Sequence, residues 1–101
     1  MGATIQNSGD IESIIQDSGV GPGDQAKVVF RTWDDTSPPF TVKVKGPTGK
    51  TVFDRVIREL PTGEPMSAPP ITFLVATKGA YSIQIKELYG KQEGEAVLTV
   101  Q

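Results

Sequence analysis

A chain of 101 residues with no cysteine and no histidine excludes disulfides, thiolate nucleophiles, thiolate or imidazole zinc sites and the common catalytic triads. Its net charge is −2 and no run of Lys or Arg forms a basic stripe, so the electrostatic footprint of a nucleic-acid-binding protein is missing. Hydrophobic residues make up 37% of the chain, and no apolar run approaches the ~20 residues that span a membrane. We therefore expect one globular domain over 1–101.

The first 24 residues are expected to form two short strands and a loop. The spacing of Ile11, Ile14 and Ile15 also fits a helical turn, but β-branched side chains and the turn residues at 7–10 (NSGD) favour strands. The following run, 17–24 (DSGVGPGD), is rich in turn-forming residues and predicts a loop.

Alternation of apolar and polar residues predicts a strand over 25–33 and another over 40–45, separated by a proline-containing loop at 34–39. One face of each strand is expected to be buried. Val29 and Trp33 on the second face of the first strand indicate partial cover there as well. The inward-facing residues are Ala26, Val28, Phe30, Phe40, Val42 and Val44.

The segment 46–49 (GPTG) predicts a tight turn, in which proline takes the second position and glycine supplies a positive φ. Residues 50–60 are expected to return as a strand with a bulge near Asp54–Arg55, because their apolar residues change parity there. A helix is the competing interpretation, so 51–60 is left open between strand and helix. The residues with helical spacing are Phe53, Val56, Ile57 and Leu60.

After a proline-rich stretch at 61–70, which does not suit a central strand, the pattern predicts three further strands. They lie at 71–77, 81–88 and 95–101, with a turn at 78–80 and a polar loop at 89–94. Together these elements predict an all-β fold, an antiparallel β-sandwich of seven or eight strands, Ig-like or jelly-roll in type. The expected single core consists of Phe40, Val42, Val44, Phe73, Tyr81, Ile83 and Leu98.

Two turn motifs carry a resemblance to known domains. They are Pro47-Thr48-Gly49 after a central strand and Gly79-Ala80-Tyr81 at the start of the penultimate strand. With them, the region 25–101 resembles small extracellular Ig-like and jelly-roll accessory domains, and its pattern is most similar to GOLD-like and pre-peptidase C-terminal-like sandwiches. It lacks the disulfide of the eukaryotic cargo-receptor members. It is also similar to soluble domains of archaeal surface-appendage proteins. The resemblance implies an extracellular or cell-surface location and implies no active site.

Residues beside the expected loops are the candidate binding residues. Trp33 and Tyr89 each adjoin a loop, where an aromatic ring can stack on a sugar or anchor a protein partner. The alternative for Trp33 is that it fills one end of the core. Asp34 and Asp35 could bind Ca²⁺ through loop oxygens, or they could be solvated loop acids. Tyr81 is expected in the core, with its hydroxyl bonded to a loop backbone, as in tyrosine corners.

Two charged groups are better explained by structure than by chemistry. Three glutamates near Tyr89 could supply a glycosidase acid and base, but such pairs need a deep cleft. Five basic residues in 40–60 could bind an acidic polymer, but such residues also protect sheet edges from aggregation. The glutamates are Glu87, Glu93 and Glu95, and the basic residues are Lys43, Lys45, Lys50, Arg55 and Arg58.

The sequence therefore predicts a non-catalytic accessory or structural module that mediates protein–protein contacts in a secreted or cell-surface assembly. One alternative is a carbohydrate-binding module that uses Trp33 and Tyr89, with a polysaccharide as the partner. A second alternative is the soluble domain of an archaeal surface-appendage protein. We expect no enzyme activity, no cofactor, no metal, no nucleic acid and no membrane-spanning segment within this chain, and the oligomeric state is left open.

Overall fold

The computed structural model describes residues 2–32, 38–58 and 71–101. Within these ranges the chain forms eight strands and no helix, so the all-β prediction is confirmed. The strands are β1 (Ala3–Gly9), β2 (Ile11–Ile15), β3 (Gln25–Thr32), β4 (Phe40–Lys45), β5 (Thr51–Ile57), β6 (Ile71–Leu74), β7 (Gly79–Glu87) and β8 (Glu93–Val100).

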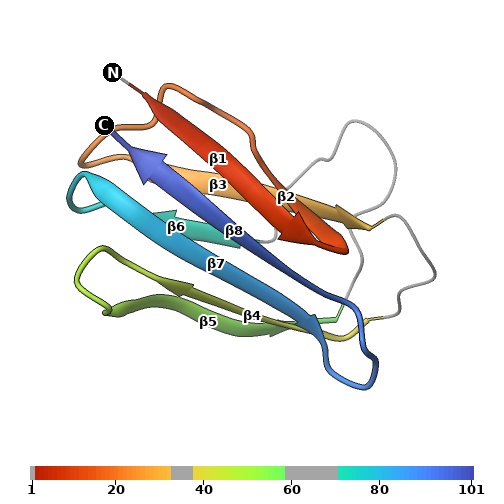
Figure 1. Cartoon of the computed structure of the whole chain (residues 1–101). Coiled ribbons are helices and arrows are strands. Elements are labelled where there is room, and N and C mark those ends of the chain that lie inside the picture. Colours follow the sequence, from red (N-terminus) through yellow and green to blue (C-terminus); the bar gives the residue numbers. More distant parts are fainter. Residues whose placement is uncertain (1, 33–37, 59–70) are drawn as a thin grey trace.

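Two antiparallel sheets form the sandwich that the alternation predicted (Figure 1). The larger sheet has the strand order β1-β8-β7-β4-β5, and the smaller has the order β2-β3-β6. The first two strands are both present, but they belong to different sheets. The chain passes from one sheet to the other at Asp10, whose N–H donates to the carbonyl of Glu93 at 2.7 Å. β1 runs through the expected turn at 7–10 as far as Gly9.

The core lies between the two sheets and contains every residue that the sequence placed there. The seven predicted core residues are all buried, together with the inward side chains of β3. Two aromatic pairs span the core: the ring centroids of Phe30 and Phe40 are 5.1 Å apart, and those of Phe73 and Tyr81 are 5.7 Å apart. Val29 on the second face of β3 is 4% exposed, which confirms the expected cover on that face.

The hydroxyl of Tyr81 forms the predicted link to a loop backbone. It donates to the carbonyl of Thr77 at 2.5 Å and accepts from the N–H of Thr77 at 3.3 Å. The ring itself is 2% exposed. The side chain therefore joins the start of β7 to the preceding loop while its ring packs in the core.

Replacing Tyr81 by phenylalanine keeps the ring and removes both hydrogen bonds to Thr77. We expect the free energy of unfolding to fall by about 1–2 kcal/mol, because the Thr77 groups lose a buried partner. Urea denaturation of the wild type, Tyr81→Phe and Tyr89→Phe measures the effect. The hydroxyl of Tyr89 is on an exposed side chain, so its removal should change the stability by less than about 0.5 kcal/mol. Equal stabilities for all three proteins would contradict the role of the Tyr81 hydroxyl.

The segment 51–57 is a strand, so the helical interpretation is wrong for these residues; Leu60 lies outside the described residues. The bulge is also not at Asp54–Arg55. The register shifts between Val44 and Lys45, which pair with Phe53 and Thr51, so Val52 is the additional residue. The irregularity lies beside the turn at 46–49 because the Gly46 N–H bonds the Lys50 carbonyl at 2.8 Å and fixes the end of the hairpin.

The later strands have different ends from those expected. β6 stops at Leu74 rather than at residue 77, because Val75 bonds to the loop before β3: its N–H donates to the carbonyl of Asp24 at 2.9 Å, and its carbonyl accepts from Gly23 at 2.7 Å. Gly23 has a φ of +95°, which turns the loop away and ends regular pairing. The expected turn at 78–80 already contains the first residues of β7, and β8 begins two residues earlier than expected, at Glu93.

Candidate functional site

One end of the sandwich carries the predicted binding residue that the structure describes. Tyr89 lies in the loop between β7 and β8, and its side chain is 87% exposed. Leu88 beside it is 42% exposed. The other three candidates, Trp33, Asp34 and Asp35, lie outside the described residues, as does most of the expected loop at 34–39 and all of 61–70. The joint use of Trp33 and Tyr89 in carbohydrate binding therefore stays a prediction.

The β7–β8 loop holds Tyr89 on a well-bonded support. The Glu87 N–H donates to the Gln92 carbonyl at 2.9 Å, and the Gln92 N–H donates to Oε1 of Glu87 at 2.9 Å. The Leu88 N–H donates to the carbonyl of Pro39 at 2.9 Å. A Cβ at Gly90 would lie 2.6 Å from Oε1 of Glu87, so only glycine lets this carboxylate fold beneath the loop. The loop backbone that carries Tyr89 is thus held in place, so binding at this residue has little backbone entropy to lose.

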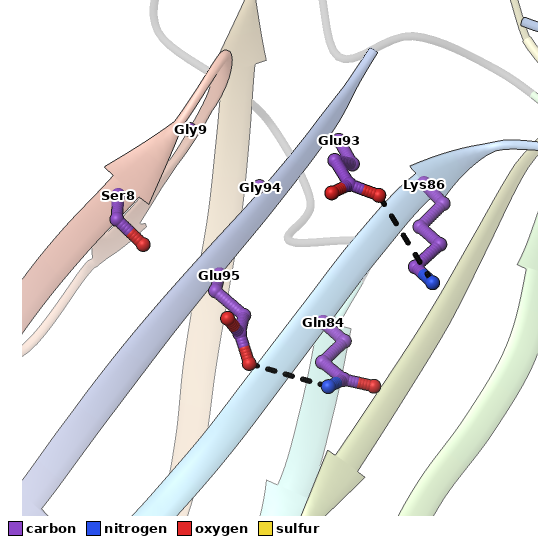
Figure 2. A pocket seen from close by; sticks show the side chains of 7 residues that line it. All are labelled: Ser8, Gly9, Gln84, Lys86, Glu93, Gly94 and Glu95. Carbon is purple, nitrogen blue, oxygen red and sulfur yellow. Dashed lines mark hydrogen bonds and ion pairs between the residues drawn. The ribbon is translucent and has the colours of Figure 1, made fainter. Parts of the chain in front are cut away.

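A shallow hollow of about 170 Å³ lies on the outer face of the larger sheet, near the same end (Figure 2). Its charged and polar side chains pair with each other: Gln84 Nε2 donates to Glu95 Oε1 at 3.2 Å, and Lys86 Nζ lies 4.0 Å from Glu93 Oε2. Glu93 and Glu95 thus line one hollow, whereas Glu87 bonds its own loop. No group of three or more acidic side chains in the described part of the chain could hold a metal ion.

The two margins of the larger sheet differ in how their backbone groups are used. At the β1 margin, the Ala3 N–H donates to the Ser18 carbonyl at 2.8 Å. The side chain of Asn7 bonds the backbone of Ser13 twice: Nδ2 donates to the carbonyl at 2.9 Å, and Oδ1 accepts from the N–H at 2.7 Å. The following segment of the chain therefore satisfies much of this margin.

At the opposite margin, the hydrogen-bond pattern leaves the outer side of β5 unused. The Leu88 N–H donates to the carbonyl of Pro39, so the backbone groups at position 39 face β7. Backbone groups alternate in direction along a strand, so the odd-numbered residues of β4 bond β7 and the even-numbered residues bond β5. The partners of these even-numbered residues are Phe53, Arg55 and Ile57. The backbone groups of Asp54 and Val56 consequently point away from the sheet, and among the described residues no strand or loop pairs with them.

We call this margin the open edge, defined by Asp54, Val56 and Arg58, the next position of the same parity. All three side chains are exposed, and Val56 is 45% exposed. Nζ of Lys43 lies 4.0 Å from Oδ2 of Asp54, between two largely solvated side chains. The guanidinium carbon of Arg55 lies 5.5 Å from the centroid of the Phe53 ring, over the inward face. The basic residues of 40–60 are therefore split between the two faces of β5 and its neighbour, not gathered into one patch.

In comparisons with known proteins, no family model, no curated protein and no solved structure matches the chain. No helix long and apolar enough to cross a membrane occurs in the ranges that the structure covers. The strand order defines the class of protein: the chain is an antiparallel β-sandwich with a five-stranded and a three-stranded sheet.

Proposed function

We propose that this chain is a non-catalytic module that mediates protein–protein contacts in a secreted or cell-surface assembly, and that the open edge of β5 makes the contact. An unpaired strand edge is a row of N–H and C=O groups that a further strand can complete. The carrying observation is that Asp54 and Val56 direct these groups outward with no partner among the described residues.

The composition of β5 supports this role. Edge strands that avoid pairing are short, or carry proline, charged residues (lysine above all) or a bulge along their length. β5 has seven residues, TVFDRVI, with neither proline nor lysine, and its one irregularity lies at the turn. Its two charged residues, Asp54 and Arg55, oppose indiscriminate pairing and restrict the edge to a strand whose charges complement them. The exposed Val56 gives an arriving strand an apolar side chain to pack against on the outer face.

The finer form of the sandwich is part of the same proposal. We favour the Ig-like over the jelly-roll type because the bond from Tyr81 to Thr77, at the start of the penultimate strand, has the pattern of a tyrosine corner. Two further parts of the proposal, the extracellular location and the similarity to GOLD-like and pre-peptidase C-terminal-like sandwiches, are supported by the turn motifs alone.

The proposal is tested by selecting displayed extended peptides on the immobilised chain. Selected peptides should shift the NMR amide signals of Asp54 and Val56. Their binding should be lost in Val56→Lys, because a lysine on an edge strand opposes pairing. The matched control is Val97→Lys: Val97 is 43% exposed on the outer face of β8, an inner strand, and its replacement should leave binding unchanged. Selected peptides that shift only the β7–β8 loop, or equal binding by both variants, would contradict the proposal.

The exposure of Tyr89 favours a second candidate, carbohydrate binding through the β7–β8 loop. On this candidate, a polysaccharide titration changes the fluorescence of the single tryptophan, and Tyr89→Ala abolishes the change. The absence of any change with every glycan tested would remove the carbohydrate candidate and leave the protein contact.

A further inference from the structure

We propose that the open edge pairs with the open edge of a second copy of this chain, antiparallel, with Val56 facing Val56 across a two-fold axis. The inference rests on the proposed function, since it names the partner of the same edge. Pairing of two β5 strands joins the larger sheets of two copies into one continuous sheet.

The hydrogen-bond pattern restricts the registers of such a pair. The backbone N–H and C=O groups that can bond across the new junction belong to the even-numbered residues of β5, because its odd-numbered residues already bond β4. In an antiparallel pair of identical strands, an even-numbered residue must therefore face an even-numbered residue. Three registers then centre on the exposed middle of β5, with the axis at Asp54, at Arg55 or at Val56.

Charge separates these three registers. An axis at Asp54 places two aspartates directly opposite each other, and an axis at Arg55 does the same with two arginines. Like charges directly opposite in a sheet are unfavourable. An axis at Val56 instead places valine opposite valine and brings Asp54 opposite Arg58 of the second copy, once on each side of the axis. Only this register is complementary in charge.

In this arrangement the outer faces of the two larger sheets also lie on the same side of the joined sheet. A two-fold axis perpendicular to the sheet keeps the outer face outside, so Asp54, Val56 and Arg58 of both copies lie on one surface. The ion pair of Asp54 with Lys43 is long, at 4.0 Å, and the Asp54 side chain is 64% exposed, so the carboxylate is accessible to a second cation. Figure 1 shows β5 at the margin of the sheet, with β1 at the far side.

The test is the oligomeric state of the full chain, measured by sedimentation velocity from micromolar to near-millimolar concentration. The wild type should form a dimer as the concentration rises. Asp54→Arg and Arg58→Asp should each weaken dimerisation about tenfold or more, because each creates two like-charge pairs. A mixture of the two variants should dimerise again, since Arg at 54 of one copy then faces Asp at 58 of the other. The control Lys27→Glu reverses an exposed charge on β3 and should leave dimerisation unchanged.

Each variant is first checked for an unchanged thermal transition. If either charge reversal fails to fold, Asp54→Asn and Arg58→Gln replace the pair, and each should weaken dimerisation. A wild type that stays monomeric throughout, a dimer that is insensitive to both charge reversals, or a mixture that fails to dimerise would overturn the inference. If the protein stays monomeric but still binds peptides at β5, the proposed function stands and only the dimer is excluded. If it neither dimerises nor binds peptides at β5, both proposals are excluded.

Discussion

Replacing Phe73 by alanine is expected to lower the free energy of unfolding by roughly 3–5 kcal/mol. Phe73 is 3% exposed, and its ring lies 5.7 Å from that of Tyr81 between the two sheets. The substitution removes the apolar contacts and leaves a cavity that the surrounding strands can fill only in part. For a domain with a total stability of about 5–15 kcal/mol, this loss is a large share.

The neighbouring residue supplies the control for this experiment. Leu74 follows Phe73 in β6, points to the other face and is 54% exposed. Leu74→Ala should therefore change the stability by less than about 0.5 kcal/mol. Urea denaturation followed by far-ultraviolet circular dichroism measures both variants. Similar losses at the two positions would show that β6 does not bury one face in the way the structure describes.

Replacing Gly94 by alanine is expected to cost roughly 3 kcal/mol or more, because β8 crosses β2 with no room for a side chain at this position. A Cβ at Gly94 would overlap the backbone carbonyl oxygen of Ile11 and lie 2.9 Å from the Ile11 Cβ. The backbone cannot easily withdraw, because the adjacent Glu93 carbonyl accepts the bond from Asp10 that holds the crossing between the sheets.

Gly21→Ala is the matched control for this second experiment. The nearest atom to a Cβ at Gly21 is Oδ2 of Asp24, at 3.9 Å, and Gly21 does not have a positive φ. Its replacement should leave the thermal midpoint nearly unchanged, while Gly94→Ala should lower it strongly. A Gly94→Ala variant as stable as Gly21→Ala would mean that β2 and β8 do not approach as closely as described.

Alternation along β4 and β7 was sufficient to predict which of their side chains are buried, because each strand of a sandwich must turn one face to the core. Phe40, Val42 and Val44 follow this rule, as do Tyr81 and the rest of β7. The position of the bulge could not be predicted in this way. Its place at Val52 depends on how the turn at 46–49 pins the end of the hairpin.

Strand order is a second property that the pattern of side chains does not contain, because pairing joins segments far apart in the chain. Nothing in the residues of β1 and β2 indicates that they belong to different sheets. In the same way, the sequence around Asp54 and Val56 would be the same whether β5 were an inner strand or an edge strand. The sequence therefore indicated Tyr89 as a candidate binding residue but contained no signal for the open edge.

The outer side of β5 is expected to be unpaired in the monomer and to become paired on association. Amide hydrogen exchange of Val56, measured by NMR in dilute and in concentrated solution, distinguishes the two states. The Val56 amide should exchange fast at low concentration and become increasingly protected as the concentration rises. The amide of Val44, which bonds β5 within the sheet, should stay protected throughout. A Val56 amide that is already protected in the dilute monomer, or that stays unprotected at every concentration, would contradict pairing of the open edge on association.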